Sequence, residues 1–154
     1  MKTGIFVLIA VLLVVSLAGY ELFGHCQIPC GIYDDPVRFT LLEEHCTTIE
    51  KSMKEIVRIS GSSEPNWNQV VRWTKNKELH ADELSHIVTH YFMAQRLKPA
   101  EVKDREAHTK YVRELTMLHR MVVHAMKAKQ TTDLNHVEAL RSLIASYKAS
   151  YFDK

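Results

Sequence analysis

The chain has 154 residues, with 20 lysines and arginines against 18 aspartates and glutamates, and a formal net charge of +2. This length suits one domain with an N-terminal extension, and the balanced charge, without a clustered basic run, argues against nucleic-acid binding. Glycine and proline number only 5 and 4, which favours helices over a β-sandwich or a disordered chain.

Residues 1–24 are predicted to be a cleavable hydrophobic leader. Lys2 gives a short positive start, and the uncharged apolar run 4–19 follows it, as is typical of an export signal. Small residues mark one cleavage site after Ala18 and a second, poorer match after Gly24. An uncleaved membrane anchor is the alternative. In both cases the following domain is expected to be exported to the periplasm or another extracytoplasmic space.

A histidine and two of the three cysteines follow the leader directly, in the stretch HCQIPCGIY at 25–33. If the chain is cut after Gly24, His25 supplies a free amine and an imidazole. The amine, the amide nitrogen of Cys26 and the thiolates of Cys26 and Cys30 can then form a planar set of two nitrogens and two sulfurs. Such a set favours nickel(II) or copper(II) over zinc, which prefers a tetrahedron.

Two other interpretations of this hook stay open. The same donors suit a non-enzymatic carrier of nickel or copper. A disulfide between Cys26 and Cys30 in a membrane-anchored helical module is the second alternative. The third cysteine, Cys46, is expected to be a small buried apolar residue of the first helix.

Four amphipathic helices are predicted after the hook. Asp35 as the cap and Pro36 at the first helical position begin the first helix, which ends near Gly61. Ser63 as the cap and Pro65 begin the second helix, which ends at 98. The predicted buried stripe of the first helix is Leu42, Cys46, Ile49, Met53 and Ile56. That of the second is Val70, Trp73, Lys77, His80, Leu84, Ile87, Tyr91 and Ala94.

The third helix is expected over about 100–129, and Thr132 or Asp133 is expected to cap the fourth. The predicted stripe of the third is Val112, Leu115, His119, Val122 and Met126. That of the fourth is Val137, Leu140, Ile144, Tyr147 and Tyr151. Short connections between such helices predict an all-α, up-down four-helix bundle. The predicted domain spans 25–154 and begins with the hook at 25–33.

Nine histidines call for a search for metal ligands within the bundle. Glu83 and His86 form a Glu-x-x-His motif, but a di-iron bundle needs a second copy, which is missing. His86 and His90 lie four residues apart, which favours a surface or interface pair over a zinc site. His80 is expected to face the core with its hydrogen bonds satisfied.

The hook resembles that of the nickel-containing superoxide dismutases, whose pattern is H-C-x-x-P-C-G-x-Y, and all its fixed positions match. Less specific matches follow at 72–73, 76–81, 91–92 and 98–99. The resemblance implies a four-helix bundle that assembles as a homohexamer. It also implies an enzyme that disproportionates superoxide to dioxygen and hydrogen peroxide by cycling nickel between the +2 and +3 states.

The resemblance further implies the roles of the hook residues. His25, Cys26 and Cys30 would be the nickel ligands, and Tyr33 and His25 would be catalytic. Tyr33 would order water beside the metal and restrict access to it. A leader-removing protease would free the N-terminus. The family uses a first-helix carboxylate to hold the histidine imidazole, and Glu43 or Glu44 is the candidate for it here. The membrane would be contacted only through an uncleaved leader.

Overall fold

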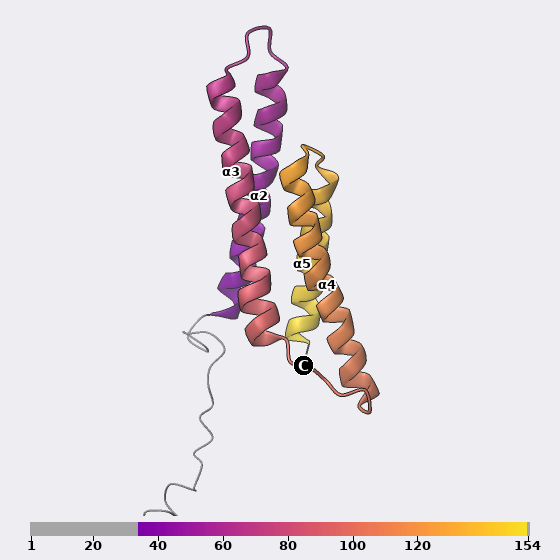
Figure 1. Cartoon of the computed structure of the whole chain (residues 1–154). Helices are drawn as coiled ribbons and strands as arrows, with labels where there is room; N and C mark the ends of the chain where they lie inside the picture. The colour runs from indigo at the N-terminus through magenta and orange to yellow at the C-terminus, as the bar shows by residue number, and fades with distance from the viewer. Residues whose placement is uncertain (1–33, 154) are drawn as a thin grey trace, which may run out of the picture.

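The computed structural model describes residues 34–153 as a bundle of helices. The elements are α2 at Asp35–Ser60, α3 at Trp67–His86, η1 at Ile87–Arg96, α4 at Arg105–Gln130 and α5 at Asn135–Phe152. The π-helix η1 continues α3 directly, so α3 and η1 form one continuous helix (Figure 1). The leader and the hook, predicted at 1–33, lie outside the described residues.

The helices run up, down, up and down, as Figure 1 shows. Helix α2 packs against α3 and α5, and α4 packs against α3 and α5. The α2–α3 pair extends beyond the α4–α5 pair at the end where residues 61–66 connect them (Figure 1). The prediction of an all-α up-down four-helix bundle is confirmed. None of the helices between residues 34 and 153 is both long and apolar enough to cross a bilayer.

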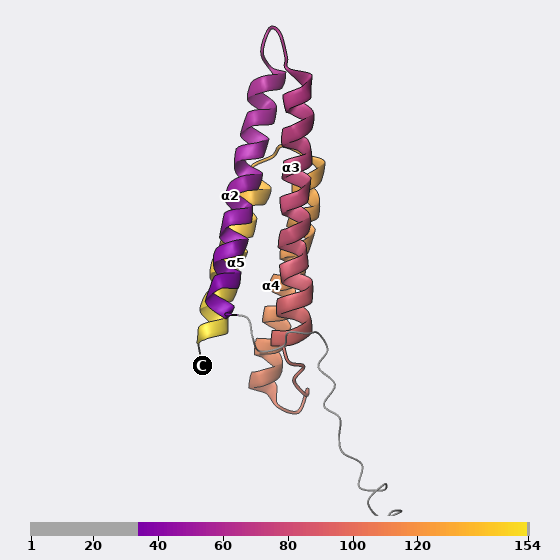
Figure 2. The ribbon, with the colours of Figure 1, turned by 90° about the vertical axis from the view of Figure 1, so that its left-hand side faces the viewer.

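The chain enters α2 beside the C-terminal end of α5, as Figures 1 and 2 show from two sides. An aromatic cluster fills the core at this end. Phe39 of α2 lies 4.8 Å from Phe92 of η1 between ring centroids, and Phe92 lies 5.2 Å from Tyr147 of α5. All three rings are fully buried, and such aromatic pairs stabilise a core beyond the area they bury. The entry point of α2 is therefore packed tightly against η1 and α5.

The predicted stripes of the first and last helices are largely confirmed. In α2, Leu42, Cys46, Ile49 and Met53 are fully buried, and in α5 so are Val137, Leu140, Ile144 and Tyr147. Ile56 and Tyr151, the last members of the two stripes, are half-buried. Gly61 ends α2, as predicted.

All four predicted helix starts are wrong by one or more residues, and α5 has Leu134 at its N-cap in place of the predicted Thr132 or Asp133. Asp34, rather than Asp35, is the N-cap of α2, and its side chain makes no capping hydrogen bond. Asn66, rather than Ser63, caps α3, and its side chain accepts a hydrogen bond from the backbone N–H of Gln69 at 3.2 Å. Asn and Ser cap helices about equally well, so the sequence offered two equivalent starts.

The π-helix rotates the end of the predicted second stripe. Ala94 is exposed, whereas Val88 and Phe92 are buried. A π-helix has hydrogen bonds from i to i+5 and more residues per turn than an α-helix. The positions that face the core therefore differ from those that the α-helical spacing predicts. The helix ends at Arg96 rather than at residue 98.

The predicted stripe of the third helix is wrong. Val112, His119 and Met126 are exposed, and Leu115 and Val122 are only half-buried. The buried face of α4 consists of Glu114, Leu118, Met121, Ala125 and Ala128. Helix α4 carries apolar residues on two faces, and the face with two alanines and a glutamate gave the weaker hydropathy signal. Asp104 caps the helix, so it begins at Arg105 rather than near residue 100.

A buried lysine forms hydrogen bonds at the C-terminal end of α4. Lys77 of α3 is only 3 % exposed, and its ammonium group donates hydrogen bonds to the carbonyl oxygens of Ala128, Lys129 and Thr131 at 2.8, 2.7 and 2.8 Å. The last carbonyls of a helix have no partner within the helix and carry partial negative charge, which a cation satisfies. Lys77, predicted to face the core, thus fixes α3 to the end of α4.

Candidate metal centre

The first turn of α2, where the predicted hook joins the bundle, is held by the side chain of Asp35. Tyr91 of η1 donates a hydrogen bond to Asp35 Oδ1, and Tyr151 of α5 donates one to Asp35 Oδ2 at 2.7 Å. Arg96 Nε donates to Asp35 Oδ1 at 2.8 Å, and Arg96 also donates to the Tyr91 hydroxyl at 2.8 Å. One carboxylate therefore joins α2, η1 and α5.

This arrangement shifts the pKa values of Asp35, Tyr91 and Tyr151 away from their ordinary values. Burial by itself raises the pKa of Asp35, but the hydrogen bonds from Tyr91, Tyr151 and Arg96 outweigh it and bring the pKa below its ordinary value. Burial and the hydrogen bond to Asp35 raise the pKa of both Tyr91 and Tyr151. At neutral pH the carboxylate is therefore charged and both phenols keep their protons.

A second cluster lies further along α2, where it faces α3. His45 Nδ1 and His80 Nδ1 are 2.8 Å apart, and Glu83 Oε2 lies 3.7 Å from His45 Nδ1 and 3.9 Å from His80 Nδ1. Burial and the neighbouring His80 lower the pKa of His45, against the opposing effect of Glu83 and Glu44. His80 is half-buried and hydrogen-bonded, as predicted.

The sequence prediction did not include His45. The sequence motif pairs Glu83 with His86, three residues later, whereas in the structure Glu83 meets His80, three residues earlier, and a histidine of another helix. The His80–Glu83 spacing of i to i+3 is visible in the sequence. The partner on α2 is not, because it depends on the register between two helices.

The pair His86 and His90 lies on the surface, as predicted. Their rings stack with centroids 4.1 Å apart, and both residues are exposed. Cys46 is fully buried, and burial raises the pKa of its thiol to about 12. A thiol in such surroundings is neither a nucleophile nor a metal ligand at neutral pH, which confirms its expected apolar role.

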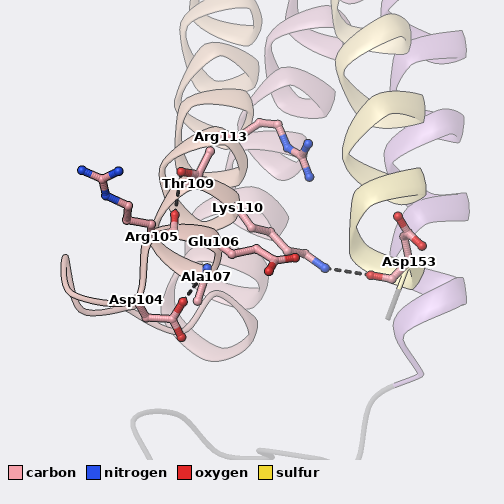
Figure 3. A pocket seen from close by; sticks show the side chains of 8 residues that line it. All are labelled: Asp104, Arg105, Glu106, Ala107, Thr109, Lys110, Arg113 and Asp153. Atoms are coloured by element: carbon pink, nitrogen blue, oxygen red, sulfur yellow. Dashed lines mark hydrogen bonds between the residues drawn. The ribbon is translucent and has the colours of Figure 1, made fainter.

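A surface hollow of about 900 Å³ lies between the start of α4 and the end of α5 (Figure 3). Its charged groups are of both signs, and Lys110 is turned toward the carbonyl of Asp153, to which it donates a hydrogen bond of 2.7 Å. Among residues 34–153, no histidine or cysteine lines it. The hollow therefore offers none of the nitrogen or sulfur ligands that transition metals prefer.

Comparison with known proteins identifies the family. The family model described as nickel-containing superoxide dismutase matches residues 20–154. The chain belongs to this family. No curated protein sequence and no solved structure matches the chain significantly. The match takes in both the predicted hook and the whole bundle.

Membership of the family confirms several predictions at once. This nickel superoxide dismutase is an oxidoreductase, nickel is its metal and superoxide is its substrate. The predicted ligands His25, Cys26 and Cys30, and the predicted catalytic residue Tyr33, lie outside the described residues and stay predictions. Residue 34, directly after Tyr33, is the first residue that the structure describes.

The two glutamates predicted as candidates to hold the imidazole of His25, Glu43 and Glu44, belong to the described part of the chain. Glu43 and Glu44 are both exposed on α2, and Glu43 Oε1 lies 3.5 Å from Lys148 Nζ. Leu42, next to them, is fully buried. Among residues 34–153, no ion pair joins Glu43 or Glu44 to a histidine, whereas Glu83 lies within 4 Å of two.

Proposed function

We propose that this nickel superoxide dismutase holds its metal in the hook, after cleavage behind Gly24. The observation that supports this most is the family match, which begins before the hook and runs to the end of the chain. The ligands would be the amine and imidazole of His25, the amide nitrogen and thiolate of Cys26, and the thiolate of Cys30. Both the cleavage site and the ligand set are proposals.

The proposed donors fit nickel by their chemistry. Two thiolates with an amine and a deprotonated amide are electron-rich, and nitrogen–sulfur sets of this kind suit square-planar nickel(II). Bound nickel supplies a one-electron redox couple between its +2 and +3 states, which an aquo ion does not offer. The leader would block the amine of His25, so its removal would complete the ligand set.

The remaining hook residues would control superoxide and protons. Two superoxide anions and two protons give one dioxygen and one hydrogen peroxide, so the site must deliver protons. The phenol of Tyr33 would order water beside the open side of the site and restrict its access. The Asp35 network, one residue further on from Asp34, would hold the base of the hook against η1 and α5.

The test of the ligand set compares the three cysteines. Mature protein is loaded with nickel, its N-terminus is sequenced, and its nickel content and superoxide decay are measured. We expect Cys26→Ser and Cys30→Ser to lose both nickel and activity, and Cys46→Ala, the matched control, to keep both. His25→Ala should keep some nickel and lose most turnover. Full activity in either hook cysteine variant, or a mature chain that begins at Met1 or Gly19, would contradict the proposal.

We also propose that the protein is exported and forms a homohexamer. The leader pattern of residues 1–24 supports export, by a signal peptidase-like cut or by a dedicated protease. Val112 and Met126 of α4 are 44 % and 48 % exposed, and an apolar helix face of this kind supports burial between subunits. Cell fractionation and sedimentation of the mature protein test the two statements. Cytoplasmic retention would contradict export, and a monomeric mass would contradict the hexamer.

A further inference from the structure

We propose that His45, His80 and Glu83 form a second divalent-metal site, which binds zinc(II) between α2 and α3. It is separate from the nickel hook and uses none of its residues. Among residues 34–153, these three form the one group of three potential ligands whose donor atoms converge within 4.8 Å of one another. Two histidines and one glutamate are also a recurrent ligand set of zinc sites that keep an open coordination position.

The distances between the donor atoms fit one ion. Bonds of about 2.0–2.1 Å from zinc to each ligand place neighbouring ligands of a tetrahedron about 3.3 Å apart. In the cluster the three separations are 2.8, 3.7 and 3.9 Å. They lie on both sides of the expected value, so small side-chain rotations bring all three donors to bonding distance without moving a helix.

At least one of the two imidazoles directs a lone pair toward this point. Nδ1 atoms that are 2.8 Å apart have room for one proton between them, so at least one ring directs a lone pair at the other. A zinc ion can take the place of that proton and bind both nitrogens. The carboxylate of Glu83 then supplies negative charge as the third ligand.

The cluster is closed on one side and open on the other. The side chains of His45 and His80 are 11 % and 26 % exposed, whereas that of Glu83 is 49 % exposed. An ion can therefore enter past Glu83, and water can complete its coordination from the same side. The buried side fixes the direction of the His45 ring, as metal binding requires.

Two other histidine pairs each lack either converging nitrogen atoms or a third donor. The rings of His86 and His90 lie parallel, at an interplanar angle of 10°, rather than directing nitrogens at a common point. His124 Nδ1 and His136 Nδ1 are 3.4 Å apart, but no third donor of the described chain joins them to make a group of three. His136 therefore offers a matched control for His80.

The test uses the full chain with Cys26→Ser and Cys30→Ser, so that the hook thiolates do not compete. Cobalt(II) is added as a spectroscopic probe, followed by zinc. We expect one cobalt per chain with the intense visible bands of a four-coordinate ion, and their loss when one equivalent of zinc is added. His80→Gln and Glu83→Gln should each weaken cobalt binding about tenfold or more, whereas His136→Gln should leave it unchanged.

Circular dichroism shows that each variant is folded, and the thermal midpoint gives a second readout. Zinc should raise the midpoint of the parent chain and of His136→Gln, but not that of His80→Gln, because an ion that binds only the folded state stabilises it. A folded parent chain without visible cobalt bands would overturn the proposal. So would unchanged cobalt affinity in His80→Gln. Neither result bears on nickel in the hook.

Discussion

The substitution Asp35→Asn tests how firmly the first turn of α2 is held. The charged carboxylate accepts hydrogen bonds from Tyr91, Tyr151 and Arg96. A hydrogen bond to a charged group stabilises a protein by about 1.5–3 kcal/mol, and a neutral acceptor contributes roughly half as much. Three weakened bonds, in a side chain that is 28 % exposed, predict a loss of about 2–3 kcal/mol in the free energy of unfolding at pH 7.

The pH dependence separates this effect from a general packing defect. The pKa of Asp35 is lower in the folded protein than in the unfolded chain, where it is about 3.9. The carboxylate therefore stabilises the fold above about pH 4, and this contribution is lost as the pH falls through the folded pKa. The difference between the parent protein and Asp35→Asn should be full at pH 7 and smaller at pH 3.

Urea unfolding followed by circular dichroism gives the measurement. With a slope of about 1–3 kcal/mol per molar urea, the expected loss lowers the midpoint by about 0.7–3 M. Asp34→Asn is the matched control, because Asp34 is exposed and its side chain caps nothing. A loss below about 0.5 kcal/mol at pH 7, or the same loss at pH 3 and pH 7, would refute the reasoning.

Three further predictions concern buried side chains. Lys77→Met should cost about 2–4 kcal/mol in urea unfolding, because three carbonyls at the end of α4 lose their donor; a loss below 1 kcal/mol would contradict this. Cys46, with its pKa raised by burial to about 12, should resist thiol reagents at pH 8 until the protein unfolds, and labelling at the rate of a free thiol would exclude that burial. Leu118→Ala should cost about 2–5 kcal/mol and Leu115→Ala clearly less, because only Leu118 is fully buried; the reverse order would show that α4 turns its other face inward.

The fold was predictable where one face of a helix is clearly more apolar than the others. In α2 and α5 the large apolar side chains recur at helical spacing and are buried. In α4 the choice between Leu115 and Leu118 depends on neighbouring helices, since the buried face also contains Glu114 and two alanines. The π-helix was not predictable, because its rotation follows from tertiary packing rather than from a local propensity.

The candidate metal-binding residues were also only partly predictable from the sequence. The hook is a local motif, so its residues and spacing could be identified in the sequence without a fold. The triad of His45, His80 and Glu83 depends on contact between α2 and α3. Only His80 and Glu83, three residues apart, belong to one local sequence pattern. His45 enters the cluster because the pairing of the two helices places it opposite them, and a single sequence does not contain that register.

The two clusters on α2 act on different parts of the molecule. His45 lies ten residues after Asp35, which corresponds to about 15 Å along a helix. Contacts separated by that distance without shared partners contribute to stability almost independently. The Asp35 network can therefore fix the start of α2 against η1 and α5, while the triad fixes α2 to α3 further along. A change at one cluster need not disturb the other, because the helix between them is held at both places.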